Sequence, residues 1–107
     1  MTPELEQTLT LLSSHRSFLG YILMSRGHPY SIIRHSGAIF EGEHGRKYAR
    51  AVGKIVESVQ GSLEELGGDG NDGDDVRFLR IRTKKHELMI SPDDKYLLAV
   101  LHDPSTA

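Results

Sequence analysis

Residues 76–104 read VRFLRIRTKKHELMISPDDKYLLAVLHDP, and this stretch decides the fold. Apolar and β-branched side chains come in short runs bounded by turn residues, which is typical of β-strands. Three strands are predicted, over residues 76–83, 86–91 and 96–102. In the last run both alternating sets of side chains are largely apolar, so we expect a strand in the middle of a sheet with both faces covered.

Two short segments separate these strands. Pro92 and Asp93 are favoured in tight turns and predict a turn between the last two strands. Lys84 and Lys85 are poor residues for a two-residue hairpin loop, which prefers Asn or Gly. The residues alone therefore leave the geometry of the first turn open.

A second hairpin is predicted near the N-terminus. Residues 17–24 (SFLGYILM) are apolar on both alternating sets, which again indicates a central strand. Residues 25–27 supply a turn. Residues 28–36 (HPYSIIRHS) predict a returning strand, and Pro29 suits an edge strand or the start of a strand.

A short amphipathic helix is predicted at the N-terminus. Thr2 suits the N-cap and Pro3 the first helical position. Leu5, Leu9 and Leu12 then recur at helical spacing. One stripe of this helix should therefore pack against the rest of the protein.

A longer helix is predicted to begin between Glu41 and Arg46 and to end at residues 67–68. Its apolar positions fall on one face: Tyr48, Val52, Ile55, Val56, Val59, Leu63 and Leu66. Gly53 lies on the shoulder of this face, with Ala49, and a glycine in a helix costs about 1 kcal/mol relative to alanine. Either another helix approaches closely there, or the glycine is tolerated on a solvated shoulder.

These elements predict one α+β domain over residues 1–107, in the order α-β-β-α-β-β-β. Two doubly covered central strands favour an antiparallel sheet of about five strands with a helix on each face. Residues 67–75 (GGDGNDGDD) are acidic and lack apolar side chains. We expect them to form a flexible surface loop within the domain.

Composition limits the partners and the location. The chain has 107 residues, a formal net charge of −2 and no cysteine. The charge gives no reason to expect nucleic acid or a membrane as partner, so a protein partner is expected. Without cysteine, no disulfide or thiolate site can form. No apolar run approaches the ~20 residues of a membrane helix, and the N-terminus lacks a signal-peptide pattern, so a cytoplasmic location is expected.

Several patterns resemble nucleotide-binding or metal-binding motifs, but their sequence context does not fit such sites. The glycines of residues 68–73 match GxGxxG, but a helix precedes them and a strand follows, the reverse of the dinucleotide-binding order. Gly73 and Arg80 stand where EF-hand spacing from Asp69 needs oxygen ligands. The histidines show no helical zinc spacing: His15, His28, His35, His44, His86 and His102. We expect no cofactor, no metal and no catalytic residue, hence no enzyme.

The edges of the sheet suggest how the chain assembles. Residues 28–36 and 76–83 are the expected edge strands, and unpaired edges are templates for other strands. In the second, Leu79 and Ile81 alternate with Arg80 and other outward arginines. Either these arginines blunt the edge, or it pairs with a copy of itself in a two-fold dimer. The outward row also suits an acidic protein partner.

One family resembles this chain. FLRIRTKKHELMI over residues 78–90, followed by Pro92 and Asp93, closely resembles the C-terminal half of dynein light chains of the roadblock type. Residues 20–36 (GYILMSRGHPYSIIRHS) resemble the first hairpin of that family more loosely. The longer helix resembles it mainly in pattern, whereas the opening of that helix and residues 67–75 depart from it.

This resemblance implies a roadblock/longin-like fold and a non-catalytic light chain of the cytoplasmic dynein motor. It implies a homodimer, or a heterodimer with a paralogue, that binds a helical segment of the dynein intermediate chain, supports microtubule-based transport and lies on the cytoskeleton. The dimer would join through the third strand and second helix. The implied contact residues are Ala49, Gly53, Arg77, Leu79, Ile81 and Thr83.

Two other functions stay open. Another class of roadblock protein is a scaffold or regulator that binds a small GTPase through a similar dimer surface, and its partner would depend on nucleotide state. A ligand-binding module or enzyme of profilin-like shape is a third possibility, but the absence of a convergent catalytic set counts against it.

Overall fold

The computed structural model describes residues 3–14, 16–27, 30–67 and 75–104. The order of its elements confirms the predicted α-β-β-α-β-β-β arrangement and adds one 3-10 helix, η1. The elements are α1 (Pro3–Ser13), β1 (Phe18–Ser25), β2 (Ser31–Ser36), η1 (Ala38–Phe40), α2 (Gly42–Gly67), β3 (Leu79–Arg82), β4 (Glu87–Pro92) and β5 (Tyr96–His102).

The five strands form one antiparallel sheet in the order β2-β1-β5-β4-β3. β1 and β5 are therefore central, and β2 and β3 are the edges, as both alternation patterns predicted. The doubly apolar strands lie centrally because only a central strand has covered side chains on both of its faces over its whole length.

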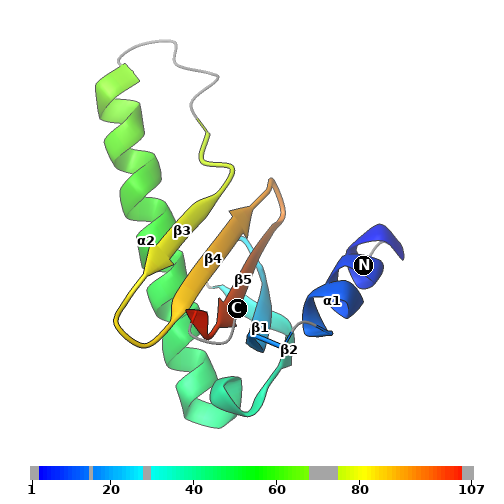
Figure 1. The fold of residues 1–107 in the computed structure, drawn as a ribbon. Coiled ribbons are helices and arrows are strands. Elements are labelled where there is room, and N and C mark those ends of the chain that lie inside the picture. Colours follow the sequence, from blue (N-terminus) through cyan, green and yellow to red (C-terminus); the bar gives the residue numbers. More distant parts are fainter. Residues whose placement is uncertain (1–2, 15, 28–29, 68–74, 105–107) are drawn as a thin grey trace.

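α2 covers one face of the sheet (Figure 1). Its apolar stripe packs on the strands to form the main core, whose fully buried side chains include Val52 and Val56 from α2. The strands contribute Ile22, Met24, Ile90, Leu97 and Leu101 to this core. The C-terminal end of α2 projects past the sheet, so that Leu66, predicted to be covered, is 84% exposed.

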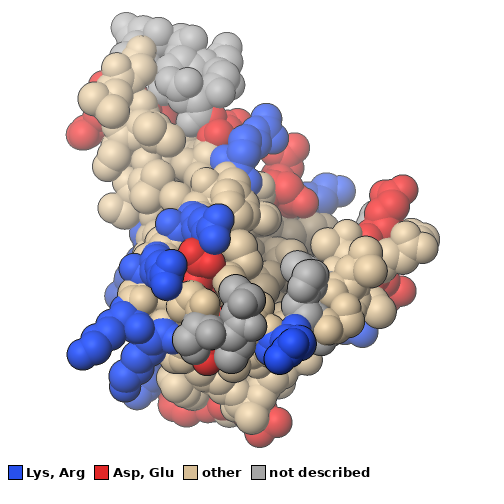
Figure 2. Space-filling view, viewed as in Figure 1, with Lys and Arg blue, Asp and Glu red and all other residues tan. Residues whose placement is uncertain are grey.

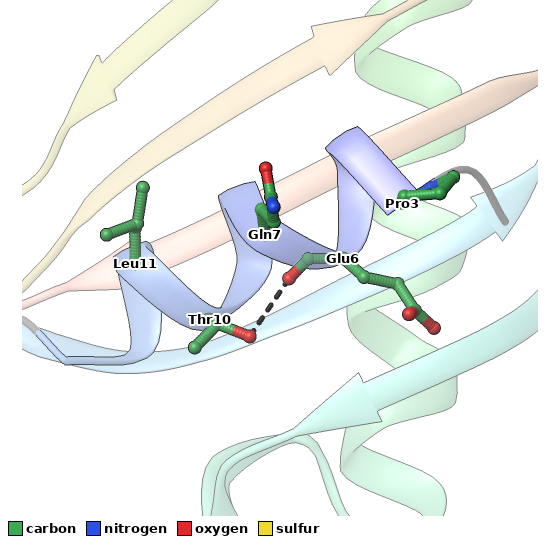
Figure 3. A pocket seen from close by; sticks show the side chains of 5 residues that line it. All are labelled: Pro3, Glu6, Gln7, Thr10 and Leu11. Atoms are coloured by element: carbon green, nitrogen blue, oxygen red, sulfur yellow. Dashed lines mark hydrogen bonds between the residues drawn. The ribbon is translucent and has the colours of Figure 1, made fainter.

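α1 lies on the opposite face of the sheet from α2 (Figure 3). Leu9 is buried there against Tyr21 and Val100, in a smaller apolar cluster. A salt bridge of 3.4 Å between Glu6 and Arg34 links α1 to β2. The side chains of Leu5 and Leu12, predicted to share the stripe of Leu9, lie outside the described part of the structure, as do Thr2 and Pro29.

The structure corrects the predicted start of the third strand. β3 begins at Leu79 rather than at residue 76. The reason is that the backbone N–H of Val76 donates to Oε1 of Gln60 on α2, at 2.8 Å, so the chain is still anchored to the helix there. α2 ends at Gly67, as predicted. Residues 68–74 of the predicted acidic loop lie outside the described residues.

The turn between β3 and β4 consists of Lys84 and Lys85. The N–H of Thr83 donates to the carbonyl of His86 at 2.9 Å, and the hydroxyl of Thr83 accepts the N–H of His86 at 3.2 Å. Neither lysine has a positive φ. The hydroxyl of Thr83 therefore closes a turn that lacks the usual Asn or Gly. The predicted turn after Pro92 is also present, closed by Asp93, whose Oδ1 accepts two backbone N–H groups.

Phe40 is 1% exposed, at the point where η1 meets the start of α2. Glycines lie next to Phe40, and a side chain at either of two of these positions would collide with Phe40. A Cβ on Gly20 would lie 2.9 Å from Cδ2 of Phe40, and a Cβ on Gly45 would clash with the Phe40 carbonyl oxygen. Gly37 has φ of 101°, a conformation that favours glycine, and it allows the chain to turn into η1.

Candidate interaction surfaces

Among the described strands β3 pairs only with β4, so its other edge is open. Its register with β4 is regular, and Leu79 and Ile81 are half-buried on the side of the sheet that faces α2. The edge strand β2 differs, because its register shifts and leaves Ile33 as an extra, 47% exposed residue. Such a bulge twists an edge and hinders further pairing. β3 is therefore the edge better suited to adding a strand.

Ala49 and Gly53 lie on the flank of α2 that faces β2, not β3. Ala49 is buried in the main core and borders Tyr30 and Ile32. Gly53 lies under the ring of Tyr30, since a Cβ there would come 2.6 Å from Cε2 of the ring. This contact accounts for the glycine within the chain. The close approach of another helix is not needed to explain it.

The other flank of α2 carries Tyr48, Ile55 and Val59, which are half-buried. Successive helical residues are about 100° apart around the axis, so Ile55 points nearly opposite to Gly53. Because β2 and β3 lie at opposite ends of the sheet, this flank is on the side of β3. It extends the apolar surface of the β3 edge onto the helix.

Arg77 and Thr83 flank β3 rather than belong to it. Arg77 is exposed in the segment that leads into the strand. Thr83 is also exposed, but its hydroxyl is engaged by His86 in the turn. Of the predicted contact residues, the structure thus brings together the four around β3 and separates Ala49 and Gly53 from them.

A polar cluster around one buried carboxylate, on the α1 side of the sheet, was not predicted from the sequence. Glu87 is 4% exposed, and its carboxylate accepts hydrogen bonds of 2.7 and 3.1 Å from the guanidinium of Arg80. Nε2 of His102 lies 2.8 Å from Oε1 of Glu87. The hydrogen bond from Arg80 lowers the pKa of Glu87 and raises that of Arg80. Glu87 and His102 face each other in neighbouring strands. The sequence does not show this pairing, because it depends on the strand register.

A groove of about 550 Å³ runs between the start of β2 and α2. It is lined by Tyr30, Ile32, Arg46, Ala49 and Arg50. The hydroxyl of Tyr30 donates to Oε1 of Glu57 at 2.7 Å. Burial and this hydrogen bond raise the pKa of Tyr30 to about 12. The hydrogen bond to Glu57 therefore holds Tyr30 in place as one wall of the groove.

The outer side of α1 carries an open hollow. Pro3, Glu6, Gln7, Thr10 and Leu11 line this hollow (Figure 3). Thr10 uses its hydroxyl to bond the Glu6 carbonyl at 3.0 Å, and Leu11 is 67% exposed.

Among the residues that the structure describes, no three His, Asp or Glu side chains are grouped so as to hold a metal ion. None of the described helices is long and apolar enough to cross a bilayer.

The family model of the Roadblock/LC7 domain matches residues 31–102. The chain belongs to the Roadblock/LC7 domain family. Roadblock membership agrees with the fold predicted from the resemblance of residues 78–90, and with the strand order of the sheet.

Solved structures share this roadblock fold. A Roadblock/LC7 domain from Streptomyces avermitilis superimposes with a TM-score of 0.71 at 18% identity, over 89% of this chain and 73% of that one. The gliding protein MglB from Thermus thermophilus gives 0.68 at 13% identity, over 98% and 77%. MglB in a tetrameric arrangement gives 0.67 at 13% identity, over 98% and 76%. These similarities establish the roadblock fold and do not single out the dynein light chains.

Proposed function

We propose that this roadblock protein is a non-catalytic homodimeric scaffold that regulates a small GTPase. The observation that carries the proposal is the open, regular edge of β3, with Leu79 and Ile81 half-buried beside it. A second copy pairing antiparallel along β3 would complete the ladder of hydrogen bonds and cover these side chains. Such a pair has two-fold symmetry and one continuous sheet.

The contact on α2 is the flank of Tyr48 and Ile55, next to β3. This revises the expected participation of Ala49 and Gly53, which are occupied by β2 and Tyr30. The dimer surface therefore consists of Leu79, Ile81 and the Ile55 flank, with Arg77 and Thr83 at its ends. A paralogous roadblock chain with a similar edge could replace the second copy in a heterodimer.

The choice of a GTPase partner rests on the relatives. Roadblock proteins include scaffolds and regulators as well as motor subunits. The similar structures named above are a bacterial roadblock domain and two of MglB, and none of them is a dynein light chain. A role as regulator therefore has more support than a role within the motor.

A light chain of cytoplasmic dynein is the second candidate. It is favoured by the close resemblance of residues 78–90, which include β3 and the turn after it. In this role the dimer would bind a helical segment of the dynein intermediate chain and act on microtubules. Both candidates use the same dimer, so the partner alone distinguishes them.

Affinity purification of the tagged full chain from its own cells separates these candidates. The lysate is divided and supplied with GDP or with a non-hydrolysable GTP analogue, and the bound proteins are identified by mass spectrometry. A small GTPase recovered in one nucleotide state supports the proposal. Dynein intermediate chain recovered in both halves would replace it with the motor role, and recovery of neither would reject both.

A further inference from the structure

The groove between the start of β2 and α2 has two arginines on the same side of the helix. Arg46 and Arg50 are one helical turn apart, so their side chains are neighbours on the helix surface. Both are exposed, and both line the groove together with Tyr30, Ile32 and Ala49. Two guanidinium groups therefore border a space of about 550 Å³.

The two arginines differ in their partners. Nε and Nη2 of Arg46 both donate to Oε2 of Glu43, at 3.2 and 2.9 Å. The side chain of Arg50 forms no hydrogen bond or ion pair within the described part of the chain. None of the described residues that line the groove is acidic. The N–H donors of Arg50 are therefore available to a bound anion.

The rest of the groove is apolar and held in place. Ile32 is half-buried against the main core, and Ala49 is buried in that core. The ring of Tyr30 lies over Gly53, and its hydroxyl donates to Glu57 at 2.7 Å. An apolar surface with a few fixed polar groups at its border is typical of sites that bind small molecules.

We propose that this groove binds a small amphipathic carboxylate, a molecule with an aliphatic or aromatic body and one carboxylate group. The carboxylate would accept hydrogen bonds from Arg50 and from Arg46, because the planar guanidinium matches the geometry of this anion. The body would cover Ile32, Ala49 and the ring of Tyr30. A volume of about 550 Å³ lies within the range of small-molecule sites, roughly 300–1,000 Å³.

The charges near the groove favour a ligand with a single negative charge. Glu43 already accepts both hydrogen bonds that Arg46 donates to it, so its carboxylate offsets one of the two cations. One cation, Arg50, then remains for the ligand. A monocarboxylate matches this charge, whereas a phosphate group would bring about two negative charges to the same place.

The groove lies away from the surface proposed for dimer formation. It is next to β2, and β3 is the opposite edge of the sheet. A bound molecule would therefore leave pairing along β3 unobstructed. Figure 2 shows a separate gathering of Lys and Arg side chains over the hairpin of β3 and β4. A cation of that hairpin provides a control for attraction by charge alone.

An NMR titration of the full chain with octanoate tests the inference. Octanamide keeps the aliphatic body without the charge, and acetate keeps the carboxylate without the body. Octanoate should bind about tenfold more tightly than either, because octanamide lacks charge-assisted hydrogen bonds and acetate buries little apolar surface. Amide chemical shifts should change in residues 30–32 and 46–50 when octanoate binds.

Variants then locate the site. Arg50→Gln changes one exposed side chain and should weaken octanoate binding about tenfold or more. Lys54→Gln, on the next turn of α2 but outside the groove, and Lys84→Gln, in the β3–β4 hairpin, should leave the affinity within about twofold. Glu43→Gln should strengthen binding about twofold, because Arg46 then loses its charged partner. Circular dichroism verifies that all variants are folded.

Several results would overturn the inference. These are equal binding of octanoate and octanamide, equal weakening by Arg50→Gln and by the lysine variants, chemical shifts confined to another surface, or no binding at millimolar octanoate. A carboxylate is also part of the phosphatidylserine headgroup, so vesicles of that lipid form a separate arm. Binding to the vesicles without binding to free octanoate would assign the groove to a membrane surface and reject a soluble ligand.

The inference goes beyond the proposed function and does not rest on it. The titration contains no GTPase, so its failure leaves the proposed function standing. Loss of nucleotide-dependent capture would likewise leave this inference standing.

Discussion

The ring of Tyr30 lies directly over Gly53, so that a methyl group at position 53 would come within 2.6 Å of Cε2 of that ring. The tyrosine is held there by the hydrogen bond of its hydroxyl to Glu57. The start of β2 is thereby fastened to the middle of α2. This contact uses the flank of α2 that the resemblance to roadblock-type light chains implied for the dimer.

Gly53→Ala should lower the free energy of unfolding by about 1 kcal/mol, because overpacking against Tyr30 outweighs the gain in helix propensity. In a Tyr30→Ala background the same change should instead stabilise by up to about 1 kcal/mol. Gly61→Ala, in the same helix with nothing near its Cβ, is the control and should stabilise in both backgrounds. Urea unfolding measures the free energy of unfolding of each substitution in both backgrounds. The same sign for Gly53→Ala in both backgrounds would refute the role of Tyr30.

Gly45→Ala should be more damaging than Gly53→Ala. Its Cβ would clash with the backbone carbonyl of Phe40, which has less freedom to move than a side chain. We expect a loss of about 2–3 kcal/mol. Phe40→Ala, which empties a fully buried site, should cost about 3–5 kcal/mol. Thermal and urea unfolding test both, and a neutral Gly45→Ala would show that η1 and α2 meet less tightly than described.

Glu87 should make stability depend on acid pH. Because the hydrogen bond from Arg80 lowers its pKa, the folded chain holds this proton less tightly than the unfolded chain. Its contribution is complete above the ordinary glutamate pKa of about 4.3 and is lost as pH falls through the lower folded pKa. Glu87→Gln should therefore destabilise near neutral pH and flatten the dependence of unfolding free energy on pH below that value.

Glu43→Gln is the matched control for Glu87. The hydrogen bond from Arg46 also lowers the pKa of Glu43, but this pair is on the surface. Solvent screens such a pair, so the change in the pH profile should be small. Equal profiles for the two variants would contradict a special role for the buried carboxylate.

The proposed dimer surface predicts that the flank of α2 around Ile55 contacts the second copy. Ile81→Asp and Ile55→Asp should each convert the dimer to monomer at micromolar concentration, because a charge would be placed on the apolar strip between the two copies. Ile33→Asp, at the bulged edge of β2, should leave the dimer intact. Sedimentation velocity measures the three variants and the wild type, with circular dichroism to verify folding. A monomeric wild type would remove the basis for pairing along β3.

Local patterns determined the elements and their layers. Strand alternation in residues 17–24 and 96–102 identified both central strands, since side chains apolar on both faces need cover on both. Helical spacing identified the covered face of α2. The resemblance of residues 78–90 identified the roadblock fold, and the family match over residues 31–102 agrees with it.

The sequence did not predict the exact start of β3 or the geometry of the turn after it. The hydroxyl of Thr83 closes a turn that lacks the usual Asn or Gly. The side chain of Gln60 accepts the backbone N–H of Val76, so β3 begins later than predicted. Both effects come from single side chains that satisfy backbone groups, and residue preferences average over such cases.

The sequence by itself determined the order of the elements, the edges of the sheet and the face of α2 that is buried, because periodicity records which side chains avoid water. Only the tertiary structure decided that Gly53 serves Tyr30, that Glu87 joins Arg80 to His102, and that two arginines of α2 share a groove with Tyr30. Those relationships depend on strand register and helix rotation, which bring together residues that are distant along the chain.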